Sequence, residues 1–189
     1  MALKTIHTKP ELVGLSMIDS AAFALTNAIF WFNQPYFTRV GIPVVWFGPL
    51  TASAMALQFL VLLQMNRLQR SLGTRVVLVL SCLLPGIAYI LLTKTNQWYI
   101  TVALVGCVIA FSSWREPLVN NQLHKNVSDE ARATTLSSLS LIGSFTGIAL
   151  NPWIGSLGDQ GLTITLLWLG IGLLVLCLPV LVVIKGQGQ

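Results

Sequence analysis

Charged residues are scarce in this chain, and their scarcity excludes a soluble globular protein. Aspartate, glutamate, lysine and arginine make up 9% of the 189 residues, whereas about 25% is typical of a soluble domain. Hydrophobic residues make up 54%. A chain with so few charges lacks the polar side chains that cover a water-facing surface, so the composition predicts an integral membrane protein that contacts the lipid bilayer.

Cysteine, histidine and clustered basic residues are also sparse, and each scarcity excludes a class of function. The three cysteines lie inside apolar runs, at a spacing that suits neither a metal site nor a disulfide framework. His7 and His124 lie in polar flanking segments, and no HExxH, GxSxG or phosphate-loop motif occurs. We therefore expect no enzyme, no metal and no cofactor. The net charge of +5 comes from scattered residues, so nucleic acid is not expected as a partner.

What the chain does contain is a series of long apolar runs. A helix needs about 20 apolar residues to cross a bilayer. Six segments are long enough: residues 13–38, 44–66, 75–93, 97–122, 132–152 and 161–184. Connections are expected at 41–43, 66–74, 93–97 and 124–130, and at 151–152 with 155–161. The sequence thus predicts an all-α membrane protein, with a six-transmembrane-helix bundle over 13–184, an N-terminal segment over 1–12 and a tail over 185–189.

Lysine and arginine near the ends of these segments predict the orientation. With a cytoplasmic N-terminus, the outer side holds only Arg39 and Lys94. The cytoplasmic side then holds Lys4, Lys9, Arg67, Arg70, Arg75, Lys125, Arg132 and Lys185. This bias predicts a multi-pass protein of the plasma (inner) membrane, with both termini in the cytoplasm.

The first and fourth segments carry most of the intramembrane polar side chains. Charges at membrane depth are costly, and they usually face a bundle interior, a partner charge or a water-filled cavity. Pro117 is expected to bend the fourth segment. The polar side chains concerned are Asp19, Asn27, Asn33, Gln34 and Tyr36 in the first segment, and Arg115, Glu116, Asn120, Asn121 and Gln122 in the fourth. Together they predict a polar pathway through the bundle.

Asp19 and Arg115 lie at matching depths in these two segments. Each is about six or seven residues from the cytoplasmic end, which places both roughly 10 Å deep at 1.5 Å per residue. Two isolated charges at equal depth cost much less when they are paired, so we expect direct contact. Two interpretations of Arg115 stay open, namely a cavity charge that binds an anionic group and a structural ion pair with Asp19.

Glu116 points about 100° away from Arg115 around the helix, so it does not share the same partner easily. One interpretation is a structural pairing with Arg67, Arg75 or Arg132 at the cytoplasmic mouth. The other is a role in proton coupling.

The fifth segment contains Gly143 and Gly147 at the spacing that lets a neighbouring helix approach closely. We therefore expect both glycines to touch another helix, either in this chain or in a partner.

The character of the segments repeats in threes: polar, rich in small residues, and apolar. Arg70-Ser-Leu-Gly-Thr74 and Gly155-Ser-Leu-Gly-Asp159, 85 residues apart, add a short sequence match. Because three is odd, the second triplet runs inverted relative to the first. Two inverted three-helix repeats are typical of transporters.

Three stretches carry a resemblance to a known family. They are Arg115-Glu-Pro-Leu-Val-Asn-Asn-Gln-Leu123, Ser128-Asp-Glu-Ala-Arg-Ala-Thr-Thr-Leu-Ser137 and Asn151-Pro-Trp-Ile-Gly-Ser-Leu-Gly-Asp159. With the helix pattern, they make the chain resemble the C-terminal six-helix half of a major facilitator superfamily transporter. The resemblance implies half of a major facilitator fold. Such a half-transporter moves a small solute by alternating access and needs a second six-helix half or a homodimer.

Two features depart from the family pattern. Asn66 stands near the place where the family's basic signature usually has an acidic residue, so the family's conformational latch is not implied. The chain also has half the helices of such a transporter. The alternative function is therefore a non-transporting membrane interaction protein or a truncated transporter remnant.

In the family's arrangement, the first and fourth helices of each half line the cavity. The resemblance thus implies a substrate cavity lined by Asn27, Phe30, Asn33 and Gln34, with Arg115 and Asn120 from the fourth segment. The other interpretation of these amides is hydrogen bonding between helices, which is also common in membranes.

Overall fold

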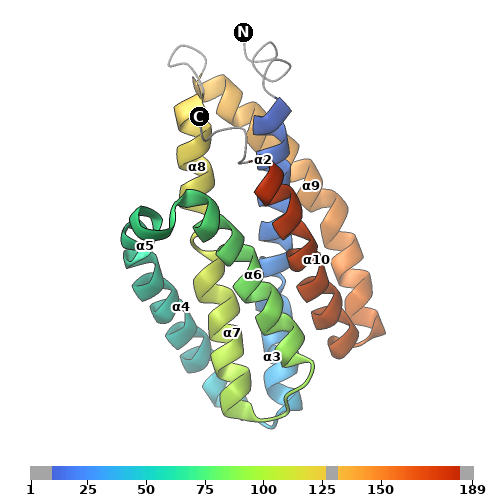
Figure 1. Ribbon diagram of the computed structural model, residues 1–189. Coiled ribbons are helices and arrows are strands. Elements are labelled where there is room, and N and C mark those ends of the chain that lie inside the picture. Colours follow the sequence, from blue (N-terminus) through green and yellow to red (C-terminus); the bar gives the residue numbers. More distant parts are fainter. Residues whose placement is uncertain (1–9, 127–131, 184–189) are drawn as a thin grey trace.

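The computed structural model describes residues 10–126 and 132–183, and in these ranges every regular element is helical (Figure 1). The elements are α2 (Pro10–Asn27), α3 (Ile29–Arg39), the short 3-10 helix η1 (Val44–Trp46), α4 (Phe47–Leu63), α5 (Met65–Leu72), α6 (Thr74–Leu92), α7 (Trp98–Ser112), α8 (Arg115–Asn126), α9 (Arg132–Gln160) and α10 (Leu162–Val183). The all-α prediction is therefore confirmed for the described part of the chain.

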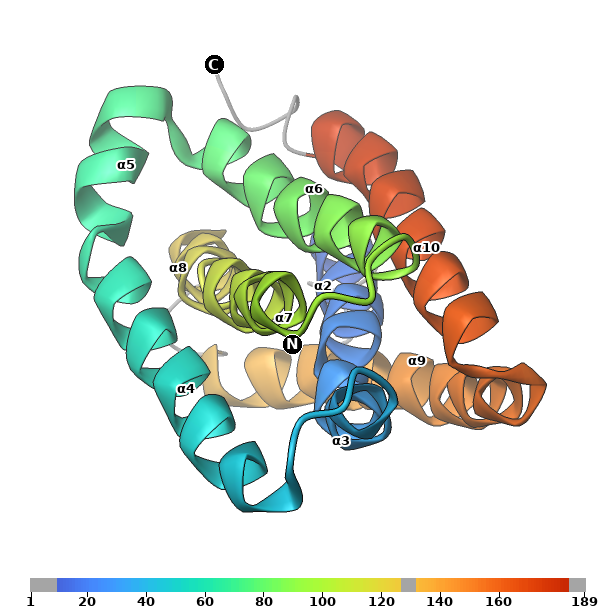
Figure 2. The same ribbon diagram turned by 90° about the horizontal axis from the view of Figure 1, so that it is seen from below.

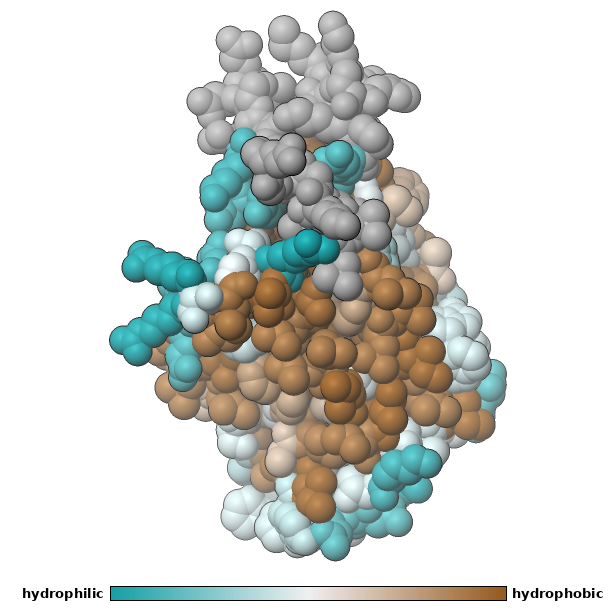
Figure 3. Space-filling view, in the orientation of Figure 1, coloured by the Kyte–Doolittle hydropathy of each residue, from teal (hydrophilic) through white to brown (hydrophobic). Residues whose placement is uncertain are grey.

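Six helical stretches are long and apolar enough to cross a membrane. They are Glu11–Arg39, Val44–Leu63, Thr74–Leu92, Trp98–Lys125, Ala133–Gln160 and Leu162–Val180. The start of α2 and the end of α10 lie at the same end of the bundle, as an even number of crossings requires (Figure 1). The face in Figure 3 is hydrophobic across its middle and hydrophilic towards both ends, which is the pattern of a multi-pass membrane protein.

The broken helices α2–α3 and α7–α8 occupy the middle of the bundle when it is seen from below (Figure 2). Helices α6 and α10 cover one side of them, while α4 and α9 flank the other side (Figure 2). The core is made by α2, α3, α6, α7 and α10, with Tyr36, Tyr89 and Leu173 among its fully buried side chains. By contrast, only 6% of the residues in the most apolar stretch of α4 are buried, and 17% of those in α9. Most of the surface of these two helices is therefore left for lipid or another protein.

Both polar segments are broken near the middle of the membrane-spanning stretch. The first is interrupted at Ala28 and the fourth at Ser113 and Trp114. A bend was predicted at Pro117, and the observed break lies just before this proline, at Ser113 and Trp114. Pro117 sits in the first turn of α8, where the missing N–H removes no intrahelical hydrogen bond.

A tyrosine from α6 secures the break in the first segment. The Tyr89 hydroxyl is within hydrogen-bond distance of two carbonyl oxygens of α2, at 3.0 Å from that of Leu25 and 3.2 Å from that of Thr26. Tyr89 is fully buried, so these carbonyls are satisfied without water.

One of the predicted connections was wrong. The connection between the second and third spanning stretches is present and contains α5, but α9 continues through Pro152 to Gln160. A proline is tolerated inside a membrane-spanning helix because neighbouring groups satisfy the freed backbone carbonyl. The chain turns at Gly73 and Gly161, whose φ angles of 82° and 115° favour glycine.

Candidate functional site

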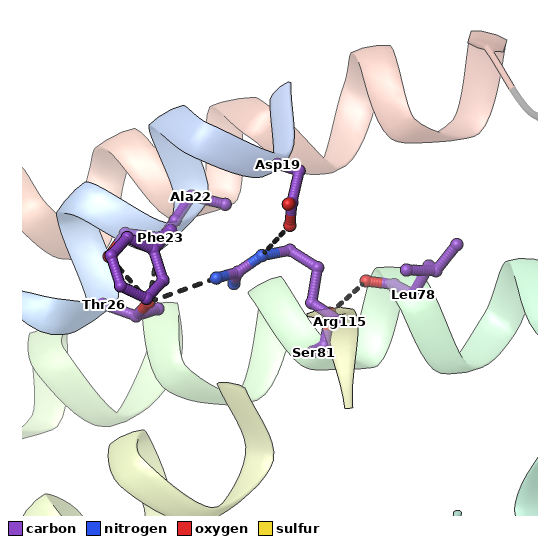
Figure 4. A network of polar contacts seen from close by, with 7 residues as sticks. All are labelled: Asp19, Ala22, Phe23, Thr26, Leu78, Ser81 and Arg115. Atoms are coloured by element: carbon purple, nitrogen blue, oxygen red, sulfur yellow. Dashed lines mark hydrogen bonds and ion pairs between the residues drawn. The ribbon is translucent and has the colours of Figure 1, made fainter. Parts of the chain in front are cut away.

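Asp19 of α2 and Arg115 at the start of α8 form an ion pair. Arg115 Nε lies 2.8 Å from Asp19 Oδ1, so the contact expected from equal depth is present. Figure 4 shows the guanidinium lying between Asp19 and Thr26, and Arg115 Nη2 is 3.5 Å from Thr26 Oγ1. The arginine side chain is 5% exposed and the aspartate side chain 25%, so the arginine is the partner that depends more on the pairing.

One nitrogen of the Arg115 guanidinium, Nη1, is free to donate a hydrogen bond to a further group. Arg115 Nη1 is buried and has no hydrogen-bond partner among the described residues. A cavity of about 120 Å³ borders Arg115 between α2, α3, α4, α7 and α8. Its polar lining includes Thr26, Asn27, Gln58 and Glu116. A buried N–H without a partner is costly, so this cavity suits a water molecule or a polar solute group.

A larger groove lies on the other side of Asn27, between α2, α8 and α9. Helices α2 and α9 touch at Gly143, where an added Cβ would collide with Ser20 Oγ. One turn earlier, Ser16 Oγ donates a hydrogen bond to the Leu139 carbonyl at 2.8 Å. At Gly147, however, an added Cβ would meet nothing within 4 Å. The contact at Gly143 therefore does not extend to Gly147, and a groove of about 620 Å³ borders this contact, lined by α9 residues on both sides of Gly143.

Hydroxyl, carboxamide and apolar side chains line this groove. Asp19 is the one carboxylate among its described lining residues, and the nearby Arg115 balances that charge. Phe23 and Trp31 add exposed aromatic surface, at 56% and 49% exposure. The remaining polar lining is Ser16, Ser20, Asn27, Asn120, His124, Ser140, Ser144 and Asn151. The groove thus offers hydrogen bonds and aromatic contact within membrane-spanning stretches, and its volume is in the range of small-molecule sites.

The structure brings together most of the side chains predicted to line a cavity. Asn27 lines both the groove and the small cavity, and Asn120 lines the groove. Phe30, Arg115 and Glu116 line the small cavity.

Asn33 and Gln34 line neither space. Asn33 is buried with its Oδ1 unpartnered among the described residues, and Gln34 is exposed. The break at Ala28 redirects α3, so the helical spacing that starts at Asn27 does not carry these two side chains to the same wall.

Two further expectations stay predictions. Glu116 is exposed and forms no ion pair with Arg67, while the side chain of Arg132 lies outside the described residues. Gly143 packs against another helix as expected. An added Cβ at Gly147 would meet nothing within 4 Å among the described residues, and Gly147 borders the groove.

The serines of the groove were missed in the sequence, although their spacing holds a signal. Ser140, Ser144 and Asn151 recur at helical intervals on α9, opposite Ser16 and Ser20 on α2. Small polar residues in a membrane segment suit close helix packing equally well, so spacing alone does not separate the two roles.

The chain matches no family model, and no curated protein or solved structure matches it. Membership of the major facilitator superfamily is therefore a hypothesis, and the groove and the ion pair are the observations that bear on it.

Proposed function

We propose that this chain is half of a transporter of the major facilitator type, which moves a small solute by alternating access together with a second six-helix half or a second copy. The observation that carries the proposal is the polar groove between α2, α8 and α9, with the Asp19–Arg115 pair at its wall. Polar and ionised groups in membrane-spanning helices usually face a bundle interior or a water-filled pathway.

The position of the groove supports the need for a second bundle. The groove lies between α2, α8 and α9. Helix α9 lies on the side of the bundle opposite α6 (Figure 2). Exposed amides such as Asn120 and Asn151 would be costly against lipid. A second bundle seated on α4 and α9 would close this side and leave an aqueous cavity between the two halves.

Two structural features support the proposed inverted repeats. The first helix of each triplet is broken, at Ala28 and at Ser113–Trp114. The third helix of each triplet starts directly after a glycine with positive φ, Gly73 or Gly161. The glycines that precede the third helices, Gly73 and Gly161, are thus 88 residues apart. The short Ser-Leu-Gly sequence match has a different spacing, 85 residues, and it relates the end of α5 to a position inside α9.

Within this proposal, Glu116 is the candidate for proton coupling. It lines the small cavity beside Arg115, and no other described carboxylate lines that cavity. A carboxylate at the wall of a solute pathway can exchange a proton with water on either side of the membrane.

Cysteine labelling tests alternating access without knowledge of the solute. Ser144 lines the groove, whereas Val175 is 57% exposed on α10, a helix that the second bundle would leave facing lipid. We expect Ser144→Cys to react with a membrane-impermeant maleimide added from either side of the membrane, and Val175→Cys to stay unreactive in lipid. Reaction of Ser144→Cys from one side alone, or from neither, would contradict transport and favour a non-transporting interaction protein or a remnant.

A further inference from the structure

The short helix α5 differs from the membrane-spanning helices in composition and direction. It lies across the end of α4 and stands away from the rest of the bundle (Figures 1 and 2). Met65 and Leu68, three residues apart, pack against the core cluster formed around Leu78 and Trp114. Gln69 Nε2 donates a hydrogen bond to Thr74 Oγ1 at 3.0 Å, which ties α5 to the start of α6. An amphipathic helix held in this way is suited to lie in the plane of a membrane interface.

The outer face of α5 carries Arg67 and Arg70, and both are exposed. Neither forms an ion pair with a described residue. The described carboxylates are Glu11, Asp19, Glu116 and Asp159. Asp19 is paired with Arg115, and Asp159 lies near the C-terminal end of α9, towards the opposite end of the bundle. Neither Glu11 nor Glu116 forms an ion pair with a described residue. The two guanidinium groups therefore have no protein carboxylate to balance them in the part of the chain that the structure describes.

The level of α5 along the bundle decides what can balance these charges. In Figure 3, hydrophilic side chains project at the position of α5, beside the edge of the hydrophobic surface. That edge is where the headgroups of a bilayer would lie. A guanidinium binds phosphate oxygens through two parallel hydrogen bonds, and long arginine side chains reach the headgroup level readily.

We propose that α5 is a binding site for the headgroup of an anionic phospholipid, held by Arg67 and Arg70 in the leaflet nearest the start of α2. Exposed Leu72 at the end of α5 adds apolar contact with the acyl chains. This site does not depend on transport, because it is separate from the groove and uses none of its residues.

Native mass spectrometry of the full chain in detergent tests the site, with phosphatidylglycerol and phosphatidylcholine titrated as probes. We expect phosphatidylglycerol to bind more tightly. The double variant Arg67→Gln with Arg70→Gln should weaken the first phosphatidylglycerol adduct by about tenfold or more, because it removes both guanidinium groups that would contact the headgroup and each basic residue near an anionic headgroup adds to its binding. The matched control is Arg39→Gln with Lys94→Gln, which removes the same charge from the other end and should leave that adduct nearly unchanged.

A charge-preserving variant separates binding from folding. Arg67→Lys with Arg70→Lys should retain most of the preference for phosphatidylglycerol. Equal binding of the two lipids to the native chain would overturn the proposal. So would an equal loss in the α5 variant and the control, which would reveal a general effect of net charge. Displacement of the lipid by millimolar inorganic phosphate would also overturn it, because the site would then be one for free anions.

Discussion

Removing either member of the Asp19–Arg115 pair should destabilise the bundle, and the two losses should be unequal. At an effective dielectric constant of about 20, unit charges about 4 Å apart attract by about 4 kcal/mol. Asp19→Ala leaves a guanidinium that is 5% exposed and stays protonated, so we expect a loss of about 3 kcal/mol. Arg115→Ala leaves a carboxylate that is 25% exposed and reaches water in the groove, so we expect about 2 kcal/mol.

The double variant isolates the interaction between the two side chains. Because it leaves no unpaired charge, we expect it to cost about 2 kcal/mol less than the two single losses together. The free energy of unfolding can be measured in mixed micelles of dodecylmaltoside and dodecyl sulfate, with helix content followed by circular dichroism.

Arg39 and Thr163 provide a matched control for this cycle. Arg39 Nη1 donates a hydrogen bond to Thr163 Oγ1 at 2.7 Å between α3 and α10, but both residues are exposed. The corresponding cycle should therefore give a coupling of about 0.5 kcal/mol or less. If the losses at Asp19 and Arg115 were additive within the same limit, the pair would not stabilise the bundle, and our reasoning from burial would be refuted.

Three further predictions follow from the packing and the charge distribution. Gly143→Ala should destabilise the bundle by about 1–3 kcal/mol in the same assay, because its Cβ collides with α2. Gly147→Ala should be neutral, and equal effects would contradict the difference in space beside the two glycines. Tyr89→Phe should cost about 1 kcal/mol through the loss of the hydroxyl at the α2 break, and an unchanged stability would show that the break needs no support from α6. Reporter fusions at Gln187 and near Asn96 should label opposite sides of the membrane, with Gln187 cytoplasmic, and a shared side would contradict six crossings.

The helices and the ion pair were predictable because a bilayer imposes simple lengths and depths. A run of apolar residues must be long enough to span, and two isolated charges at one depth are far less costly together. These two rules located the six described helical stretches that are long and apolar enough to cross a membrane, and the contact between Asp19 and Arg115.

The connections were less predictable because turn residues act differently inside a membrane. Asn151 and Pro152 would end a helix in water, yet α9 continues through them. The chain turns only at Gly161, after the end of α9. The segment after α4 was predicted only as a connection, and its helix α5 was not predicted; Met65 and Leu68 of α5 pack against an apolar cluster.

The walls of the groove depended on two features that spacing does not reveal. The break at Ala28 redirects α3, which removes Asn33 and Gln34 from the wall. The contact of α9 with α2 at Gly143 is not repeated at Gly147, and Ser144 lines the groove between these two glycines.

Spin-label accessibility in native membranes tests most directly whether the groove belongs to a solute pathway. A label at Asn27→Cys would sit where the groove and the small cavity meet, and a label at Val175→Cys would sit on the exposed apolar surface of α10. We predict that the Asn27 label relaxes more with a water-soluble nickel chelate than with oxygen, and that the Val175 label does the reverse. If both labels relaxed chiefly with oxygen, the groove would face lipid, and the account of a water-filled pathway closed by a second bundle would be wrong.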